Sequence, residues 1–312
     1  MKSPERAFRS AWQPALPSYL LITPVRDEAA HIGATVASVL AQHHRPQRWV
    51  IVDDGSTDAT PQLLRDSTRG HPWISVLRRH SAARALGSAE VLAFQHGLAH
   101  VAGEPPCDFI VKLDADLRLP ADYFERLLAY MAERPHWGIA SGVYCEWSHG
   151  QWVDIPMPAY HAAGASKVVR RACFEQIGGF VPRKGWDTVD EIRASLRGWT
   201  TGHLPELRFQ HLKPEGAAMG GLATQRFHGE ICHQTGAGLG FVLAKALHRM
   251  VSGWPPVVGG LALLWGYLWP LLTRQPRLVT PEEAQHYRRM LAARLARPWT
   301  LLRGRRRHGL KG

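Results

Sequence analysis

Short apolar runs alternate with amphipathic segments between residues 19 and 134. The runs have the length and the β-branched composition of buried strands. Four strands are predicted in this way: Leu20–Thr23, Trp49–Asp53, Ile74–Leu77 and Phe109–Leu113. The amphipathic segments predict four helices: Ala29–Gln42, Thr60–Thr68, Ala83–Val101 and Ala121–Glu133. This alternation is typical of an α/β fold with a mostly parallel central sheet flanked by helices.

The pattern becomes mixed between residues 137 and 212. Strands are expected near Gly138–Glu146 and Gly202–Phe209, and a helix is expected over Thr188–Arg197. After Pro214 the chain turns Gly-rich and apolar. We therefore expect three parts: an N-terminal extension (1–17), an α/β domain (18–212) and a helical C-terminal region (213–312).

The segment Trp254–Leu272 contains no charged residue over nineteen positions, which is close to the minimum length of a membrane span. Prolines interrupt it at positions 255, 256 and 270. Its tryptophan and tyrosine side chains are typical of the lipid headgroup zone, and basic residues flank both ends. We therefore expect an interfacial or re-entrant helix pair here. A buried amphipathic helix of a soluble oligomer is the alternative.

The net charge of +12 is unevenly distributed along the chain. Residues 281–312 hold nine Lys or Arg and two Glu, a balance that suits an anionic membrane surface. We find no zinc-finger, recognition-helix or RNA-binding motif, so the charge does not indicate a nucleic-acid partner. Met1–Pro17 has no apolar core and does not resemble a secretory signal, which predicts a cytoplasmic catalytic part. Four scattered cysteines without a Cys-x-x-Cys pair agree with a reducing compartment.

Two of the apolar runs end in paired carboxylates. Trp49–Asp53 continues into Asp54, and Phe109–Leu113 continues into Asp114 and Asp116. Ligands of parallel α/β sheets bind beyond the carboxyl ends of the strands, so both pairs lie where a ligand would bind. Asp114 and Asp116 are two positions apart, which places both side chains on one side of an extended segment. One or two carboxylates together with phosphate oxygens are what Mg²⁺ or Mn²⁺ prefers.

These motifs resemble those of the inverting family 2 glycosyltransferases, which have the nucleotide-diphospho-sugar transferase fold called GT-A. Ser18–Glu28 is similar to the family's opening strand and turn, with Asp27 where the family usually has Asn. Ala83–Gly87 resembles the family's Ala-Arg-Asn-x-Gly element, again without its Asn. Ile177–Phe180 and Trp186–Glu191 resemble the acceptor loop and the acidic base motif.

The resemblance covers residues 18–212 and implies a GT-A domain with a nucleotide-binding half (18–116) and an acceptor half (117–212). It implies seven nucleotide-sugar-binding residues: Thr23, Pro24, Arg26, Glu28, Asp53, Arg84 and Asp114. By the same resemblance Asp116 is the direct ligand of Mn²⁺ or Mg²⁺, Asp114 contacts the ribose or the metal through water, and His211 completes the metal site.

The general base is less sharply defined by the motif. Counting back from Gly198, where the family's helix ends, places the catalytic carboxylate at Asp187, with Trp186 in place of a Glu. Asp190 is the second candidate, and Glu191 lies in the same turn. Acidic residues are also favoured in the first turn of any helix, so one or two of these three carboxylates are explained as caps.

The implied activity is transfer of a sugar from a nucleotide-diphospho-sugar, with UDP as the expected nucleotide, to an acceptor hydroxyl. We expect a lipid-linked saccharide of envelope or exopolysaccharide synthesis as acceptor, and a peripheral or monotopic location at the inner face of the cytoplasmic membrane. No Gln-x-x-Arg-Trp motif is evident, which favours a single transfer over polymerisation. Two alternatives remain: transfer to a polyprenyl phosphate, and a catalytically degenerate nucleotide-sugar-binding membrane subunit.

Overall fold

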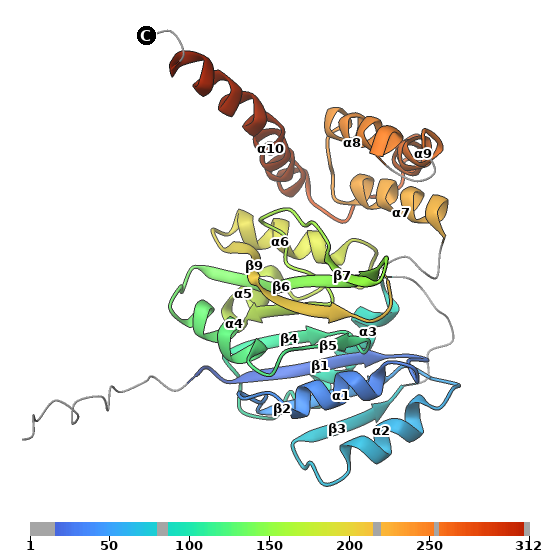
Figure 1. Cartoon of the computed structure of the whole chain (residues 1–312), viewed down its shortest axis with the longest axis vertical. Helices are drawn as coiled ribbons and strands as arrows, with labels where there is room; N and C mark the ends of the chain where they lie inside the picture. The colour runs from blue at the N-terminus through green and yellow to red at the C-terminus, as the bar shows by residue number, and fades with distance from the viewer. Residues whose placement is uncertain (1–15, 80–86, 215–219, 253–255, 309–312) are drawn as a thin grey trace, which may run out of the picture.

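The computed structural model describes residues 16–79, 87–214, 220–252 and 256–308. An α/β core extends from Tyr19 to His211, and four described helices follow it (Figure 1). Most of the expected N-terminal extension and the whole segment 80–86, which includes Arg84, lie outside the described residues.

The first half of the core is a parallel sheet with the strand order β3-β2-β1-β4. Its strands are β1 (Tyr19–Val25), β2 (Arg48–Asp53), β3 (Ile74–Arg78) and β4 (Phe109–Leu113), and each contains the apolar run that predicts it. The chain moves outward from β1 to β2 and β3 and then returns to the other side of β1 for β4. In sheets of this kind a crevice opens at the carboxyl ends of the strands beside that reversal.

The predicted helices of this half are present, and three of them are shorter than predicted. They are α1 (Ile32–Leu40), α2 (Thr60–Thr68), α3 (Ala89–His100) and α4 (Tyr123–Ala132). The residues between β1 and α1 form turns, so the chain enters the helix later than its apolar pattern suggests.

The second half of the core is a mixed sheet, as the irregular sequence pattern indicates. Strand β8 (Ser166–Arg170) lies antiparallel between β4 and β6 (Trp137–Ser148), and β9 (Thr200–His211) lies parallel to β6. The short strands β5 (Leu117–Arg118) and β7 (Gln151–Asp154) pair with β9 and β6. Helices α5 (Arg171–Ile177) and α6 (Trp186–Leu196) complete this half. Strands β5, β7 and β8 and helix α5 were not predicted from the sequence. Strand β8 was not recognised because its short apolar run contains a lysine.

Two apolar layers cover the two faces of the sheet. One layer joins α1, α2 and α4 to the sheet through residues such as Val36, Leu64 and Phe124. The other joins α3, α5 and α6 to it through residues such as Phe94 and Phe174. The prediction of a mostly parallel sheet with helices on both faces is confirmed for the first half, and the second half adds the antiparallel strands.

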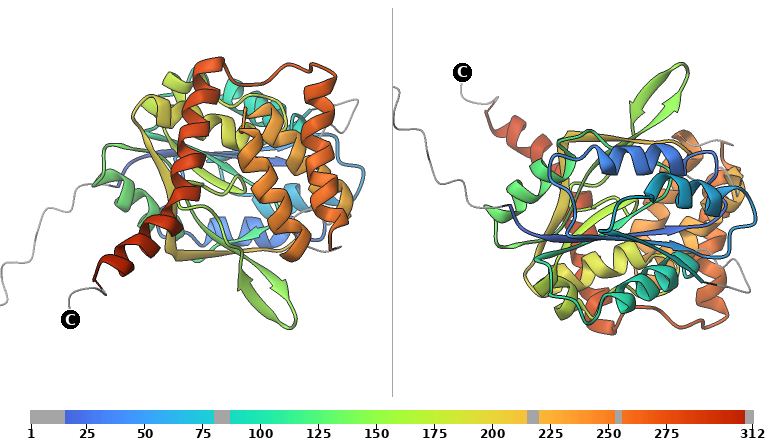
Figure 2. Two further views of the ribbon diagram at one scale, coloured as in Figure 1. Left: turned by 90° about the horizontal axis from the view of Figure 1, so that it is seen from above. Right: turned by 90° about the horizontal axis from the view of Figure 1, so that it is seen from below.

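The C-terminal helices pack on α6 and share a third apolar cluster with it. They are α7 (Gly221–Gln234), α8 (Leu239–Ser252), α9 (Val258–Leu272) and α10 (Pro281–His308). All four lie at the end of the core where α6, β6 and β9 are found (Figure 1), and the β6–β7 hairpin projects from the body (Figure 2). Helices α7 and α9 cross closely, because a Cβ at Gly266 would lie 2.1 Å from the Arg226 carbonyl oxygen.

The apolar segment forms one helix, α9, over Val258–Leu272, which corrects the expectation of a helix pair within Trp254–Leu272. Trp254 and Pro255 lie outside the described residues, and Pro270 is accommodated inside the helix near its end. None of the described helices is both long enough and apolar enough to cross a membrane.

Candidate functional site

The carboxyl ends of β1, β2 and β4 bring three predicted groups of residues to one edge of the sheet. The parallel register aligns Val25 at the end of β1 with Asp53 at the end of β2. Strand β4 ends one residue before Asp114. Thr23–Glu28, Asp53–Asp54 and Asp114–Asp116 therefore lie at one edge of the sheet, as predicted from the sequence, and ligands of parallel α/β sheets bind at this edge.

The turns after β1 and β2 hold each other in place. The Asp53 Oδ1 atom accepts a hydrogen bond from the Ser56 backbone N–H at 2.9 Å. Asp27 accepts one from the Thr57 backbone N–H at 2.7 Å, and its own N–H donates to the Ser56 hydroxyl at 2.9 Å. Asp27 has a φ of +52°, a backbone conformation that Asn and Asp tolerate better than other non-glycine residues. Asp can therefore replace the Asn of the related motif without a change of backbone.

Cationic side chains surround the carboxylates at the end of β2. The Arg78 Nε atom lies 3.8 Å from Asp53 Oδ2, and the Arg79 Nη1 atom lies 3.4 Å from Asp54 Oδ1. Arg26 contributes two buried nitrogens, Nε and Nη1, that have no hydrogen-bond partner among the described residues. Buried donors without partners are rare in folded proteins, so this arrangement fits a ligand that brings hydrogen-bond acceptors.

The first wall of the crevice is built partly by supporting residues. Thr23 is fully buried, and its hydroxyl accepts a hydrogen bond from the Trp49 indole N–H at 3.0 Å. Its side chain therefore packs inside the sheet layer, and its backbone borders the crevice. Glu28 pairs with Lys213, whose Nζ atom lies 2.7 Å from Glu28 Oε1. Lys213 follows β9 and was not predicted from the sequence.

Asp114 and Asp116 have different partners. Asp114 forms an ion pair with Lys112, whose side chain is only 2% exposed and lies 3.5 Å from Glu90. Asp116 faces His211, with 3.5 Å between Oδ2 and Nε2, and the other ring nitrogen of His211 lies 3.2 Å from Glu146. The structure therefore brings Asp116 together with His211 but holds the Asp114 carboxylate against Lys112.

The contact between Asp116 and His211 controls their electrostatics. Burial alone would raise the pKa of Asp116 and lower that of His211. Their mutual hydrogen bond and charge reverse both shifts and raise the pKa of His211 to about 9. No three His, Cys, Asp or Glu side chains of the described residues cluster tightly enough to hold a metal ion by themselves. A carboxylate and an imidazole still fit a divalent cation whose remaining ligands come from phosphate oxygens.

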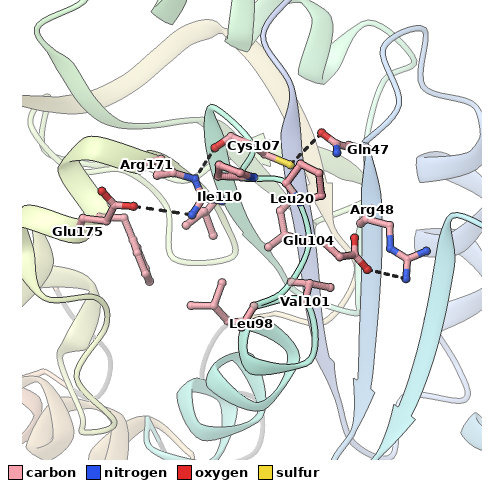
Figure 3. A pocket seen from close by; sticks show the side chains of 14 residues that line it. Leu20, Gln47, Arg48, Leu98, Val101, Glu104, Cys107, Ile110, Arg171 and Glu175 are labelled. Carbon is pink, nitrogen blue, oxygen red and sulfur yellow. Dashed lines mark hydrogen bonds and ion pairs between the residues drawn. The ribbon is translucent and has the colours of Figure 1, made fainter.

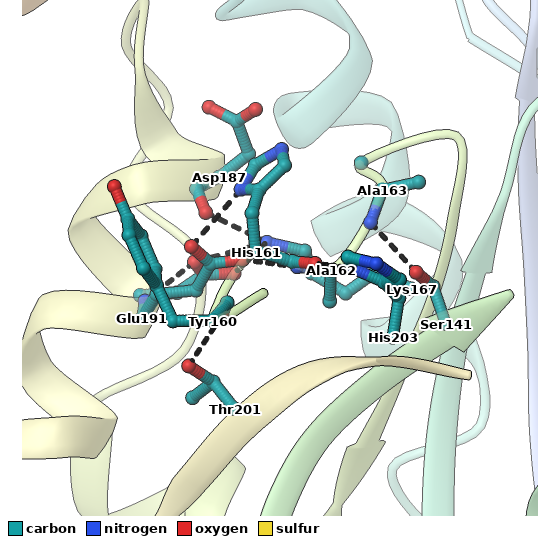
Figure 4. Close-up of polar contacts among 12 residues, drawn as sticks. Ser141, Tyr160, His161, Ala162, Ala163, Lys167, Asp187, Glu191, Thr201 and His203 are labelled. Atoms are coloured by element: carbon teal, nitrogen blue, oxygen red, sulfur yellow. Dashed lines mark hydrogen bonds and ion pairs between the residues drawn. The ribbon is translucent and has the colours of Figure 1, made fainter. Parts of the chain in front are cut away.

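The three acidic residues of α6 differ in burial: one is partly exposed and two are buried. Asp187, in the first turn, is partly exposed, and its carboxylate points away from the cluster around Lys167 (Figure 4). Asp190 and Glu191 are each 1% exposed and lie 3.0 and 3.4 Å from the Lys167 Nζ atom. Lys167 also donates to the Asp187 backbone oxygen at 2.7 Å, which fixes the start of the helix.

Burial dominates the ionisation of this cluster. It raises the pKa of Asp190 to about 8, although the Lys167 ammonium acts in the opposite direction. A carboxylate that solvent cannot reach and that is bonded to a buried lysine is poorly placed to accept a proton from a substrate hydroxyl. Of the two predicted candidates, the geometry favours Asp187 over Asp190.

A histidine that the sequence analysis missed lies beside Asp187. The His161 Nδ1 atom is 3.0 Å from Glu191 Oε2, and the other oxygen of Glu191 accepts a hydrogen bond from the Ala162 N–H at 2.7 Å. Burial would lower the pKa of His161, but the charge and hydrogen bond of Glu191 outweigh it and raise this pKa. The loop that carries His161 lacks any motif of its own, so no sequence signal indicated it.

Trp186, which replaces an acidic residue of the related motif, connects the two carboxylate sites. Its indole N–H donates to Glu90 Oε1 at 2.6 Å. Its ring lies 5.2 Å from the Lys112 ammonium and 5.1 Å from the Lys167 ammonium, both within the range of cation–π attraction. The indole of Trp186 therefore contacts side chains of both halves of the core.

A separate pocket of about 470 Å³ opens at the opposite edge of the sheet. It is lined by residues near the starts of β1, β2 and β4, including Leu20, Arg48 and Ile110 (Figure 3). Its two arginines are engaged, since Arg48 pairs with Glu104 and Arg171 pairs with Glu175. This pocket contains none of the predicted site residues.

Curated relatives match the chain over part of its length. It is 28% identical over 211 residues to the beta-monoglucosyldiacylglycerol synthase of Synechocystis sp., a match that covers 60% of this chain and 42% of that protein. It is 30% identical over 123 residues to the putative teichuronic acid biosynthesis glycosyltransferase TuaG of Bacillus subtilis (strain 168), covering 39% and 44%. The chain thus spans less than half the length of these relatives.

Solved structures share the fold. The mannosyltransferase PcManGT from Pyrobaculum calidifontis, in complex with GDP-Man and Mn²⁺, has a TM-score of 0.53 at 19% identity, covering 92% of this chain and 84% of that one. GalNAc-T7 with UDP, GalNAc and Mn²⁺ has a TM-score of 0.55 at 14% identity, covering 85% and 56%. These neighbours are GT-A glycosyltransferases, and at such identities the likeness shows the fold alone. The predicted GT-A fold is thereby confirmed.

The family model described as glycosyl transferase family 2 matches residues 20–182, which is more than half of the chain. That span begins in β1 and runs through the carboxylates after β2 and β4 to the loop before α6. The chain therefore belongs to glycosyl transferase family 2.

Proposed function

We propose that this protein is an inverting glycosyltransferase that moves a sugar from a nucleoside-diphosphate sugar to an acceptor hydroxyl. One observation carries the proposal: the same sheet edge that holds Asp53 and the Asp116–His211 pair is linked through Trp186 to Asp187. Trp186 thus ties the proposed donor site to the proposed base.

The nucleotide is proposed to bind in the crevice beside β1. Asp53 is proposed to supply an acceptor there and Arg26 to supply donors that have no hydrogen-bond partner among the described residues, with Pro24 and Glu28 as the wall. Arg84 is proposed to reach the same ligand, although it lies outside the described residues. We propose UDP as the nucleotide. Among the solved neighbours, GalNAc-T7 binds UDP and PcManGT binds GDP-Man, so GDP is the competing choice.

Asp116 and His211 are proposed to hold a divalent cation, with Asp114 behind them in contact with Lys112. The imidazole favours Mn²⁺ over Mg²⁺. When bound, such an ion neutralises the charge that develops on the leaving diphosphate. Lys213, paired with Glu28 near this position, adds a positive charge on the same side.

Asp187 is proposed to remove the proton from the attacking hydroxyl. Positioned general bases contribute roughly 10²- to 10⁴-fold to a rate. Lys167 holds the backbone of Asp187, so the start of the helix is held in place while the partly exposed carboxylate stays open to substrate. Asp190 is proposed to be structural.

The acceptor is proposed to be the hydroxyl of a lipid-linked saccharide at the inner face of the cytoplasmic membrane. The relative named for monoglucosyldiacylglycerol synthesis supports a lipid-linked acceptor. The basic composition of residues 281–312 supports a location at an anionic membrane surface.

The decisive experiment combines nucleotide binding with turnover. Thermal unfolding is measured with UDP, GDP, dTDP and CDP, each with Mn²⁺, Mg²⁺ or EDTA, and metal-dependent hydrolysis of the matching nucleotide sugar is then followed. A nucleotide at 100 times its Kd stabilises the folded protein by about 2.7 kcal/mol. The Asp116→Ala variant is expected to lose the metal-dependent stabilisation. Asp187→Asn is expected to keep it and to lose about 10²- to 10⁴-fold in turnover.

Two further variants make the result specific. Asp66→Asn, on the exposed surface of α2, is the control and is expected to resemble wild type in both assays. Asp190→Asn is expected to lower the free energy of unfolding by about 1–3 kcal/mol, because the amide accepts the buried Lys167 hydrogen bond less strongly than the carboxyl group does. Tight nucleotide binding without turnover in wild type would instead support a degenerate binding subunit.

A further inference from the structure

The outer side of α9 is a continuous apolar stripe. Its exposed residues recur at intervals of three or four, so they share one side of the helix. They are Val258, Leu261, Trp265, Trp269 and Leu272, with exposed fractions between 43% and 70%. The opposite side, which includes Leu263, Gly266 and Tyr267, is buried against α7. A surface helix of a soluble protein usually places polar residues on its outer side, and α9 does not.

Helix α8 extends this surface. Its exposed apolar residues are four positions apart: Leu239, Leu243, Leu247 and Val251, of which Val251 is 88% exposed. The two helices are in direct contact, because a Cβ at Gly260 of α9 would lie 2.4 Å from both the Ala246 carbonyl oxygen and the Met250 side chain of α8. We call the exposed apolar residues of these two helices the α8–α9 face.

The concentration of apolar surface is specific to this part of the molecule. Of eighteen exposed large hydrophobic side chains among the described residues, twelve lie between Leu222 and Leu272. The five in the α/β core are scattered singly over five elements. Isolated exposed hydrophobic residues are normal, whereas a contiguous group marks an interaction surface.

Charge indicates what covers the α8–α9 face. The sequence has no Asp or Glu between Glu230 and Glu282, and two exposed arginines, Arg274 and Arg277, follow α9 directly. Lys245 and Arg249 are half-buried on the side of α8 that faces His228 and do not belong to this face. A surface of this composition attracts an anionic partner and offers nothing to a basic one. The rings of Trp265 and Trp269 lie 5.4 Å apart, and exposed tryptophans are favoured at the depth of lipid headgroups.

Building on the membrane location proposed above, we propose that the α8–α9 face docks onto an anionic lipid bilayer, with the apolar stripes in the headgroup region and Arg274 and Arg277 at lipid phosphates. The fifteen residues of α9 are too few to cross a bilayer, so the helix lies in the plane of the interface. Helix α7 links this face to the site, since a Cβ at Gly185, two residues before Asp187, would lie 3.1 Å from the Ile231 side chain. Docking therefore brings the membrane surface to the side of the molecule that holds the proposed base.

Vesicle co-sedimentation of the full chain tests the proposal, with vesicles of phosphatidylcholine alone and of equal parts phosphatidylcholine and phosphatidylglycerol. Wild type is expected to bind the mixed vesicles more tightly. The variant Leu261→Glu/Trp265→Glu is expected to weaken that binding by at least about tenfold, because it places two charges in the apolar stripe. The matched control Leu63→Glu/Leu92→Glu changes two exposed leucines of the core and is expected to bind as wild type does.

A second variant, Leu247→Glu/Val251→Glu on α8, keeps the test valid should the α9 variant lose its fold in a thermal unfolding check. Unchanged vesicle binding in the folded variants would overturn the proposal. The proposal would also be overturned if wild type did not bind vesicles but self-associated, as measured by sedimentation, and the variants abolished that self-association. A second copy of the chain would then cover the α8–α9 face. Because no sugar donor is present, the result is independent of the transferase activity.

Discussion

At the scale of single residues, the site depends on which carboxylates are sealed and which are open. Asp187 and Asp190 lie within one turn of α6, yet only Asp187 is accessible, because Lys167 occupies the space beneath Asp190. The sequence pattern could not distinguish them, since acidic residues at a helix start serve equally as caps and as catalytic groups. Which of the two carboxylates is buried depends on Lys167, which precedes Asp187 by twenty residues in the chain.

The His161–Glu191 pair predicts a pH-dependent stability. The pKa of His161 is raised in the folded protein, so protonation favours folding, and this contribution is complete below the unfolded pKa of about 6.5. It is lost as the pH rises through the folded value. His161→Gln is therefore expected to lower the free energy of unfolding by about 1–3 kcal/mol at pH 6 and by less at pH 9, measured by urea denaturation.

His43→Gln is the control for this series. His43 also pairs with a glutamate, Glu125, but both side chains are exposed. Exposed ion pairs contribute little, so this variant is expected to change the free energy of unfolding by less than about 1 kcal/mol at either pH. A His161→Gln effect that is as large at pH 9 as at pH 6 would refute the assigned role of the pair.

At the scale of elements, the first half of the core was predictable because each of its strands is a continuous apolar run between turns. The second half was less predictable. Strand β8 carries Lys167 at a fully buried position, and a charged residue inside a short run conceals the strand. The paired carboxylates were correctly expected at the sheet edge, whereas the partnership of Asp114 with Lys112 and of Asp116 with His211 depends on contacts that no local pattern specifies.

The crossing of α7 and α9 provides an element-scale prediction. Gly266→Ala would place a Cβ 2.1 Å from the Arg226 carbonyl oxygen, so the two helices would have to move apart. We expect it to lower the free energy of unfolding by about 1–3 kcal/mol, measured by urea denaturation. Gly240→Ala in α8 is the matched change, since nothing lies within 4 Å of the added Cβ. It should leave stability unchanged or raise it by up to about 1 kcal/mol. Equal effects of the two substitutions would contradict the close crossing.

At the scale of the whole molecule, Trp186 contacts both the first and the second half of the core. Its indole N–H reaches Glu90 on α3, and its ring contacts the ammonium groups of both Lys112 and Lys167. Trp186, which departs from the related acidic motif, thus adds side-chain contacts to the pairing of β4 with β8 between the two halves. Its presence is a structural adaptation of this site and is compatible with catalysis by the neighbouring Asp187.

This connection can be tested with Trp186→Phe, which keeps a ring for the two ammonium groups and removes the hydrogen-bond donor. We expect a loss of about 1–3 kcal/mol in the free energy of unfolding, because the Glu90 carboxylate loses a partner in a partly buried place. Trp199→Phe is the control, since the Trp199 indole N–H donates to Gln176 at 2.8 Å near the surface. Its expected loss is below about 1 kcal/mol, and an equal or larger loss there would argue against the connecting role of Trp186.

The register of two neighbouring strands places the two buried lysines opposite each other. Lys112 of β4 and Lys167 of β8 are direct partners in the antiparallel pairing. Successive side chains on a strand point to opposite faces, so the insertion or deletion of one residue in β8 would turn Lys167 toward the wrong layer. Such a change would leave Asp190 and Glu191 without their cation and would remove the support of Asp187 at the same time. An insertion or deletion in β8 is therefore expected to disturb the buried charges and the proposed base together, although the strand itself contributes no residue to the proposed donor site.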